Sequence, residues 1–269
     1  MRKSLTALIL VSLAAGLLFA ISIAGATAFD NNIVRELAPN GTLRVGVAYA
    51  PTPTPVFVTR DAAGDPRGAQ RDIGAALAKA AGVPVEFVLT PNTGELTELC
   101  ASGAINVGFM PADEERRKKL DFSPPYFVIE STYLAAASID ARTIADVDRP
   151  GVTVVAINGT ATSRAAASTL KSAKLVTAKS VDEAMGMMKD GTAQAFALTR
   201  DSLPRLQSHL PGSRIVDGAF RTFDVAIALP KGRSAALAFV TNFVKTAKAN
   251  GIIRRAFDDA ALKGLPIAP

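Results

Sequence analysis

Eight charged side chains occupy the nine positions 113–121, and their order is typical of a short solvated helix. Asp113 suits the position just before the helix, where a carboxylate accepts backbone N–H bonds. Two acid-before-base pairs follow at a spacing of four residues: Glu114 with Lys118, and Glu115 with Lys119. Such pairs stabilise a helix by about 0.2–0.5 kcal/mol each, so most of this charge requires no ligand.

Arg116 is the exception in this stretch. The residue four positions earlier is Ala112, which cannot pair with it, and the apolar Leu120 shares its helical face. A guanidinium on the inward face of a helix must meet an anion or remain charged and partly desolvated. Its planar N–H groups match the two oxygens of a carboxylate, which makes Arg116 a candidate ligand-binding residue. The alternative is a solvated helix that binds nothing.

A second candidate is the turn at 158–162, which follows a predicted strand and leads into a predicted helix. Asn158, Gly159 and Thr160 form the turn, and Ala161 begins the helix. Free backbone N–H groups and the positive end of a helix meet at such a turn, which suits an anion. The segment lacks the Gly-Lys-Ser/Thr ending of a P-loop, and many similar turns bind nothing.

Residue sets for catalysis or metal binding are sparse. The single histidine, His209, has no evident pairing with a serine nucleophile, and no pair of carboxylates indicates acid–base catalysis. One histidine and one cysteine do not suffice for a typical transition-metal site. The net charge of +6 suits an anionic ligand or an ordinary basic surface, and no basic run is interleaved with aromatics as nucleic-acid binding requires. The sequence thus predicts a binding protein without metal, cofactor or nucleic acid.

Apolar runs and helical stretches alternate along the chain, and they must position both candidates. The first series contains predicted strands at 43–48, 85–89 and 105–110, with helices at 72–81, capped by Asp72, and 94–101. The second series contains predicted strands at 152–157 and 193–198, with helices at 161–171, 181–189 and 201–209. Such alternation is typical of the α/β class with mostly parallel sheets.

Two α/β series in one chain indicate two lobes. Long apolar segments at 126–138 and 223–229 are interpreted as strands that cross between them, after which the closing helices return to the first lobe. We therefore assign 29–133 and 227–269 to lobe 1, and 134–226 to lobe 2.

Residues 1–28 have the features of an export signal: a basic start, an apolar run at 5–23 and a small-x-small exit before Phe29. We predict cleavage after Ala28. An uncleaved membrane anchor is the alternative, because the apolar run is nearly long enough to span a bilayer. Both interpretations place the folded part outside the cytoplasm, in the periplasm. The single cysteine, Cys100, excludes an intramolecular disulfide and is expected in the core.

Several motifs occur in an order that identifies a family. They are Gly41-Thr42-Leu43-Arg44-Val45-Gly46, then Pro55-Val56-Phe57, then Arg116 followed by Asp121-Phe122-Ser123-Pro124-Pro125-Tyr126, and finally Gly159-Thr160. In these motifs the chain resembles the family 3 bacterial extracellular solute-binding proteins, the type II periplasmic receptors of ABC importers. The resemblance covers nearly all of the mature chain. It implies two lobes, each with a central, mostly parallel sheet flanked by helices. It also implies a monomer that closes around a small carboxylate-bearing solute and delivers it to a membrane permease.

The resemblance implies roles for individual residues as well. The family's arginine at the position of Arg116 holds the ligand carboxylate through two parallel hydrogen bonds. Backbone N–H groups at Thr160 and Ala161 hold the same carboxylate from the other lobe. Phe57 aligns with the aromatic residue that packs on the apolar part of the ligand. The predicted site consists of Phe57, Phe109, Met110, Pro111, Arg116, Asn158, Gly159, Thr160, Ala161 and Thr199.

Three positions depart from the family's amino-acid receptors. Thr199 stands where an acid usually meets the ligand ammonium, Pro111 where a hydroxyl is usual, and Asp113 where a threonine is common. A hydroxyl compensates a buried ammonium poorly, so we predict a carboxylate-bearing solute that need not be an α-amino acid, unless Asp113 or Asp201 turns inward. The alternatives to a receptor are an enzyme on the same scaffold, similar to cyclohexadienyl dehydratase, and a ligand-sensing periplasmic module.

Overall fold

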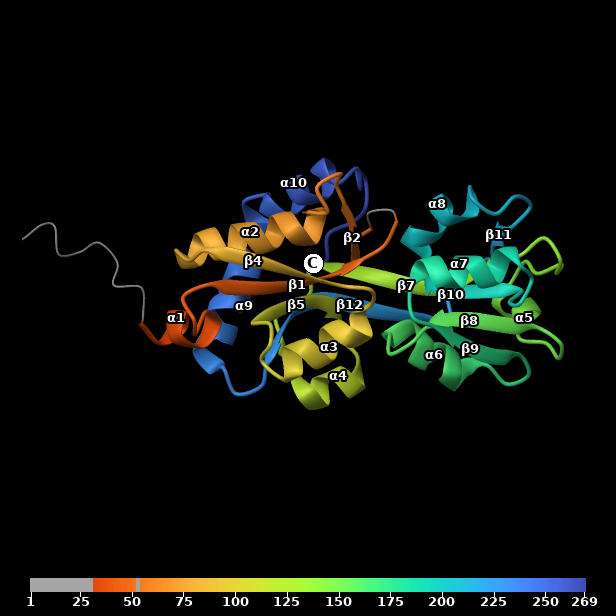
Figure 1. Ribbon diagram of the computed structural model, residues 1–269, viewed down its shortest axis with the longest axis horizontal. Helices are drawn as coiled ribbons and strands as arrows, with labels where there is room; N and C mark the ends of the chain where they lie inside the picture. Colours follow the sequence, from red (N-terminus) through yellow and green to blue (C-terminus); the bar gives the residue numbers. More distant parts are fainter. Residues whose placement is uncertain (1–30, 52–53) are drawn as a thin grey trace, which may run out of the picture. The chain divides into compact units, whose positions relative to one another are not determined.

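The computed structural model describes residues 31–51 and 54–269 (Figure 1). The predicted export signal at 1–28 lies outside the described residues. One compact body comprises Asn32–Pro269. Among the helices of the described part, none combines the length and the apolar character needed to cross a membrane.

Parallel strands form the first half of the sheet. β1 (Leu43–Tyr49) pairs in parallel with β4 (Val85–Thr90), β5 (Val107–Pro111) and β2 (Phe57–Arg60). The helices α2 (Ala69–Ala81) and α3 (Thr93–Ala101) connect them. The prediction that Asp72 caps α2 is wrong, because the helix begins directly after Gly68 and places Asp72 in its first turn.

Parallel strands also form the second half. β8 (Thr153–Ile157) lies between β9 (Lys174–Ala178) and β10 (Ala195–Thr199), and both neighbours run parallel to it. The connecting helices are α6 (Ala161–Thr169) and α7 (Val181–Lys189). The helix predicted at 201–209 is shorter and irregular: a 3₁₀ turn at Arg200–Ser202 precedes α8 (Leu203–Gln207). The carboxyl ends of β8 and β10 therefore lie side by side at one edge of the sheet.

Two long antiparallel strands connect these halves. β7 (Phe127–Ala135) pairs with β10, and β12 (Arg221–Pro230) pairs with both β7 and β5. With the short β3 (Pro66–Arg67) at one end, the strand order is β3-β2-β1-β5-β12-β7-β10-β8-β9, so the sheet continues from one parallel half to the other. The two crossing strands predicted from apolar runs are present. The assignment of lobe boundaries to particular residues remains a prediction.

The closing helices lie against the first half of the chain. α9 (Ser234–Ala249) and α10 (Ile252–Asp259) contact α2, and Figure 1 shows α10 beside that helix. The remaining short elements are α1 (Asn31–Leu37), β3 (Pro66–Arg67), α4 (Glu114–Lys119), β6 (Leu120–Phe122), α5 (Ile144–Val147) and β11 (Arg214–Ile215). Cys100 is buried in a cluster with Leu96 and Met110, and burial raises the pKa of its thiol to about 12. It is a core residue, as predicted.

Candidate ligand-binding site

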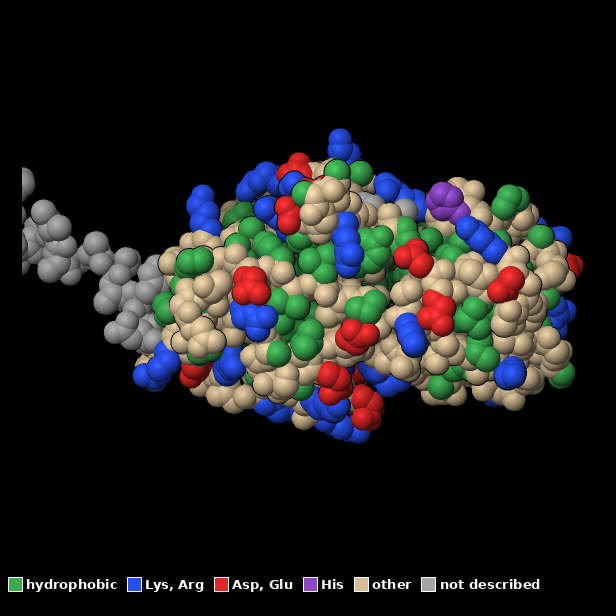
Figure 2. Space-filling view, in the orientation of Figure 1, with side chains coloured by type: hydrophobic (Ala, Val, Ile, Leu, Met, Phe, Trp, Pro, Cys, Tyr) green, Lys and Arg blue, Asp and Glu red, His purple; other side chains and the backbone are tan. Residues whose placement is uncertain are grey.

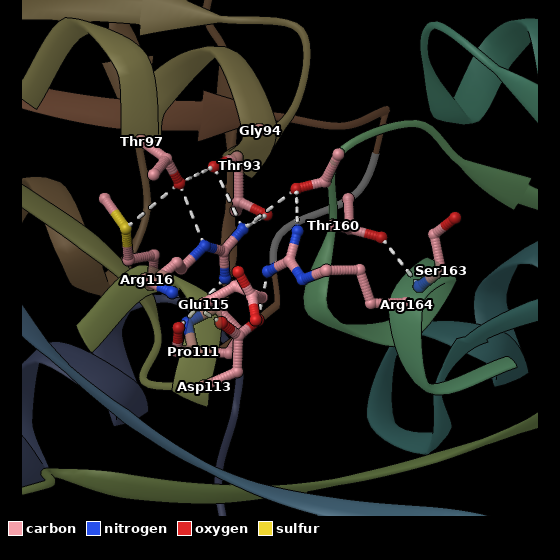
Figure 3. A network of polar contacts seen from close by, with 12 residues as sticks. Thr93, Gly94, Thr97, Pro111, Asp113, Glu115, Arg116, Thr160, Ser163 and Arg164 are labelled. Carbon is pink, nitrogen blue, oxygen red and sulfur yellow. Dashed lines mark hydrogen bonds and ion pairs between the residues drawn. The ribbon is translucent and has the colours of Figure 1, made fainter. Parts of the chain in front are cut away.

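Arg116 lies in α4 and is buried, with 1% of its surface exposed. Its guanidinium donates from Nε to the Thr97 hydroxyl at 2.9 Å and from Nη1 to the Pro111 carbonyl at 2.9 Å. Nη2 donates to the carbonyl and the hydroxyl of Thr93, at 3.0 and 2.9 Å (Figure 3). The guanidinium therefore joins the start of α3 to the end of β5.

The partners of Arg116 differ from those expected of a buried cation. All the acceptors within hydrogen-bond distance that the structure describes are neutral oxygens. Burial lowers the pKa of Arg116 to about 9, although the nearby charge of Asp113 opposes this shift. The side chain therefore stays protonated at neutral pH. It is a cation compensated by dipoles, which leaves it able to attract an anion.

The start of α6 supplies the second half of the candidate site. Thr160 precedes the helix; its hydroxyl accepts from the Ser163 N–H at 3.1 Å and donates to the Ile157 carbonyl at 2.8 Å. The Thr160 N–H also donates to the Ile157 carbonyl, at 3.3 Å. It is therefore used within the turn, and the ligand-binding role that the family resemblance implies for it stays a prediction. The N–H groups of Ala161 and Thr162 have no acceptor among the described residues, so they are the ones that can receive an anion.

The structure brings these two elements together. The Gly159 carbonyl accepts from Arg116 Nη2 at 3.4 Å and from Arg164 Nη1 at 2.9 Å. Gly94, at the start of α3, lies directly against Gly159: a Cβ on Gly94 would stand 2.9 Å from the Gly159 Cα. A groove of about 870 Å³ runs along this junction, lined among others by Gly94, Thr97, Arg116, Asn158 and Gly159. Figure 2 shows acidic and basic side chains together over α3 and α4, which agrees with a solvated outer face for the charged stretch.

The predicted residues of β2 and β5 are buried. Phe57 is 3% exposed and belongs to the main hydrophobic core. Phe109 packs edge-on against Tyr126, with ring centroids 5.9 Å apart. The Met110 sulfur accepts a hydrogen bond from Thr97 at 3.5 Å, and Pro111 contributes its carbonyl to Arg116. Met110 and Pro111 of β5 therefore accept hydrogen bonds from Thr97 of α3 and from Arg116 of α4. Neither Phe57 nor Phe109 lines the groove described above.

Thr199 ends β10 and belongs to a buried polar group. Its hydroxyl lies 2.7 Å from that of Ser202, and both residues are 3% exposed. Asp201, between them, has a carboxylate oxygen, Oδ2, that is buried without a partner in the part of the chain that the structure describes. Burial raises the pKa of Asp201 to about 6, although hydrogen bonds from its own N–H and from Thr199 act in the opposite direction.

This polar group lies close to the start of α6. Thr199 is opposite Ser131 in the β10–β7 register, and the Ser131 hydroxyl lies 2.9 Å from that of Thr162. The carboxyl ends of β8 and β10 adjoin in the same parallel sheet, which is the usual position of ligand sites in open α/β folds. Asp201 thus follows by two residues a threonine whose cross-strand neighbour contacts the first turn of α6.

Comparison with known proteins identifies the family. The sequence profile of the bacterial extracellular solute-binding proteins, family 3, matches residues 43–259. The chain belongs to this family. A comparison with curated proteins finds no match. The fold is the two-lobed α/β fold of type II periplasmic binding proteins, as predicted from the motifs.

Solved structures of other solute-binding proteins resemble this one. An ancestral amino acid-binding protein, described as a precursor of cyclohexadienyl dehydratase, is 30% identical over 84% of this chain and 97% of its own, with a TM-score of 0.72. An ancestral arginine-binding protein bound to arginine is 27% identical over 81% of this chain and 97% of its own, also with a TM-score of 0.72. The solute receptor for L-cysteine of Neisseria gonorrhoeae is 24% identical over 88% of this chain and 100% of its own, with a TM-score of 0.78, and supports the fold.

Sequence reasoning missed several residues of this family 3 solute-binding protein. Thr93 and Thr97 share one face of α3 because they are four residues apart, and this spacing was the available signal. Arg164 stands in the first turns of α6, where the helix dipole disfavours a cation, so a nearby anion stabilises it. That anion is Asp113, with which it forms an ion pair. Asp113 thus turns toward Arg164, whereas Asp201 keeps an unpartnered oxygen.

Proposed function

We propose that this family 3 protein is the periplasmic receptor of an ABC importer and captures a small carboxylate-bearing solute. The N-terminal segment exports it, the two lobes close about the crossing strands β7 and β12, and the loaded monomer docks on a membrane permease. The observation that carries the proposal is the contact of buried Arg116 with the Gly159 carbonyl, in the turn that leads into the free N–H groups of α6. A ligand held by both elements stabilises the closed arrangement, because each element comes from a different half of the sheet.

The carboxylate is proposed to bind between Arg116 and the N–H groups of Ala161 and Thr162. The contact from Arg116 to the Gly159 carbonyl is long, at 3.4 Å, so an incoming carboxylate oxygen displaces a weak acceptor. Charge-assisted hydrogen bonds are shorter and stronger than the neutral ones that they replace. The positive end of α6 adds to the attraction for an anion.

Asp201 is proposed to bind a cationic group of the same solute. Its Oδ2 lacks a partner within the described residues, and an ammonium would supply the missing hydrogen bonds and the opposite charge. The amino-acid receptors of this family place an acid at the position of Thr199. In this interpretation Asp201, two residues later, takes the role of that acid. The amino-acid-binding relatives agree with a ligand that carries both charges.

Isothermal titration calorimetry of the purified chain against matched pairs of compounds tests the proposal. Each pair contains an α-amino acid and the acid of the same skeleton without its amino group. We expect one-to-one binding of at least one carboxylate, with the aminated member tighter in the parent and the preference lost in Asp201→Asn. Binding restricted to compounds without a carboxylate contradicts the site at Arg116. An unchanged preference in Asp201→Asn contradicts the role of Asp201 alone.

A dehydratase on the same scaffold is the second candidate, and Asp201 is the observation that favours it. A carboxyl group with a pKa of about 6 can protonate a leaving hydroxyl near neutral pH. The similarity to a precursor of cyclohexadienyl dehydratase gives this candidate further support. Analysis of solutes recovered after incubation separates the two functions: a receptor returns the ligand unchanged in stoichiometric amount, whereas a dehydratase releases water and a product.

A further inference from the structure

The carboxylate of Asp113 contacts two helices, α4 and α6. One carboxylate oxygen, Oδ1, accepts from the Arg116 N–H at 2.9 Å and caps α4. The other, Oδ2, forms an ion pair with Arg164 of α6 (Figure 3). The helix that carries Arg116 is thus tied through one side chain to the helix whose start provides the free N–H groups.

The ion pair is shielded from water on the side of Asp113. The side chain of Asp113 is 10% exposed and that of Arg164 is 35% exposed. Arg164 also donates from Nη1 to the Gly159 carbonyl at 2.9 Å, which fixes its guanidinium above the turn. A partly buried pair with such an additional hydrogen bond contributes more than a fully solvated one.

Two further contacts join the same halves of the sheet close by. Asn92 caps α3 and donates from Nδ2 to the carbonyl of Lys179, the residue after β9, at 2.9 Å. Gly94 and Gly159 meet backbone to backbone, which only residues without side chains allow at this separation. None of these contacts requires a ligand.

We infer that Asp113 and Arg164 form a latch that stabilises the closed arrangement of the empty protein and so tunes the affinity of the site. The inference rests on the hinge closure in the proposed function. A receptor whose binding-competent state is only partly populated loses affinity in proportion to that population. By holding α4 against α6, the latch raises the competent fraction before the solute arrives. Asp113 and Arg164 act here as positioning residues, because the ligand contacts are made by Arg116 and α6.

Distance measurement between paired spin labels on the empty protein tests the latch. The labels are attached at Lys118→Cys in α4 and Ala167→Cys in α6, two exposed positions, while Cys100 stays buried. Asp113→Asn keeps an oxygen to cap α4 but removes the charge, and Arg164→Gln removes the other partner. We expect each variant to lower the ratio of closed to open protein about threefold to tenfold, seen as a population at longer distance.

The controls make the result specific to the ion pair. Arg164→Lys retains the charge and is expected to preserve most of the short-distance population. The double variant of Asp113→Asn and Arg164→Gln is expected to open no further than either single variant, because both remove the same interaction. Distance distributions in Asp113→Asn and Arg164→Gln that match the parent overturn the inference. Since no ligand is added, this outcome is independent of the calorimetric test of solute binding.

Discussion

Replacement of Asp201 by asparagine should make the empty protein more stable at neutral and alkaline pH. The carboxyl group has a pKa of about 6 in the folded chain, raised from 3.8 by burial. In the unfolded chain it returns to an ordinary value of about 3.9, a difference of about 2 units, or about 3 kcal/mol. An asparagine is neutral in both states and has nearly the same shape, so it avoids this cost.

The sign follows from proton binding. Between about pH 4 and about pH 6 the folded protein keeps a proton on Asp201 that the unfolded chain has lost, so the stability of the parent falls as pH rises. Above about pH 6 the Asp201 carboxyl group is ionised in both the folded and the unfolded state. The loss in free energy of unfolding that it causes then stays constant. The free energy of unfolding of Asp201→Asn should therefore match that of the parent near about pH 4 and exceed it by up to about 3 kcal/mol near about pH 8.

Urea denaturation of ligand-free protein at several pH values measures this difference directly. Asp182→Asn is the matched control at an exposed position; it removes an acid from the first turn of α7, so it should show no gain in stability over the parent at about pH 8. If the difference between parent and Asp201→Asn is the same at about pH 4 and about pH 8, Asp201 does not titrate as a desolvated carboxyl, and the argument for its free oxygen fails.

Two further substitutions test the junction. Arg116→Ala should weaken ligand binding by about 2–5 kcal/mol, measured by calorimetry, and should also lower the free energy of unfolding, because Thr93 and Thr97 lose their donor. Unchanged affinity would remove Arg116 from the site. Gly94→Ala should hold the halves apart and weaken binding, because its Cβ would stand 2.9 Å from the Gly159 Cα. Gly186→Ala, which meets nothing within 4 Å, is the control and should bind normally while unfolding at higher urea.

The fold was predictable from the sequence because its signals are local or repeated. Buried strands such as β1 and β8 are rich in apolar residues, and the motif after Arg116 indicated the family that the profile match shows. The start of α2 was misjudged, because Gly68 precedes the helix without a side-chain cap, whereas Asp72 is a residue type that often caps a helix. Where tertiary packing determines the first residue of a helix, the local sequence pattern does not predict it.

The site was predictable only in its outline. Arg116 and the turn at Gly159 were found from helix spacing and strand–turn–helix order, which are properties of neighbouring residues. The partners of Arg116 on α3 are about twenty positions away, and the pairing of Asp113 with Arg164 spans 51 positions. Contacts over such separations follow from how the sheet brings α3, α4 and α6 together, and a single sequence does not contain that information.

The neutral partners of Arg116 provide a basis for selecting anions. In the empty protein Thr93, Thr97 and Pro111 accept hydrogen bonds from the Arg116 guanidinium. A solute that binds there therefore gains only the free energy by which its own contacts exceed these hydrogen bonds. A neutral solute oxygen would replace one dipole by another and gain little. In the proposed binding mode, a carboxylate adds a full charge opposite a desolvated cation and the positive end of α6, which none of the described oxygens bonded to the Arg116 guanidinium supplies. The hydrogen bonds to neutral oxygens thus hold Arg116 in place without ligand and, in the proposed binding mode, favour a charged solute over an uncharged one.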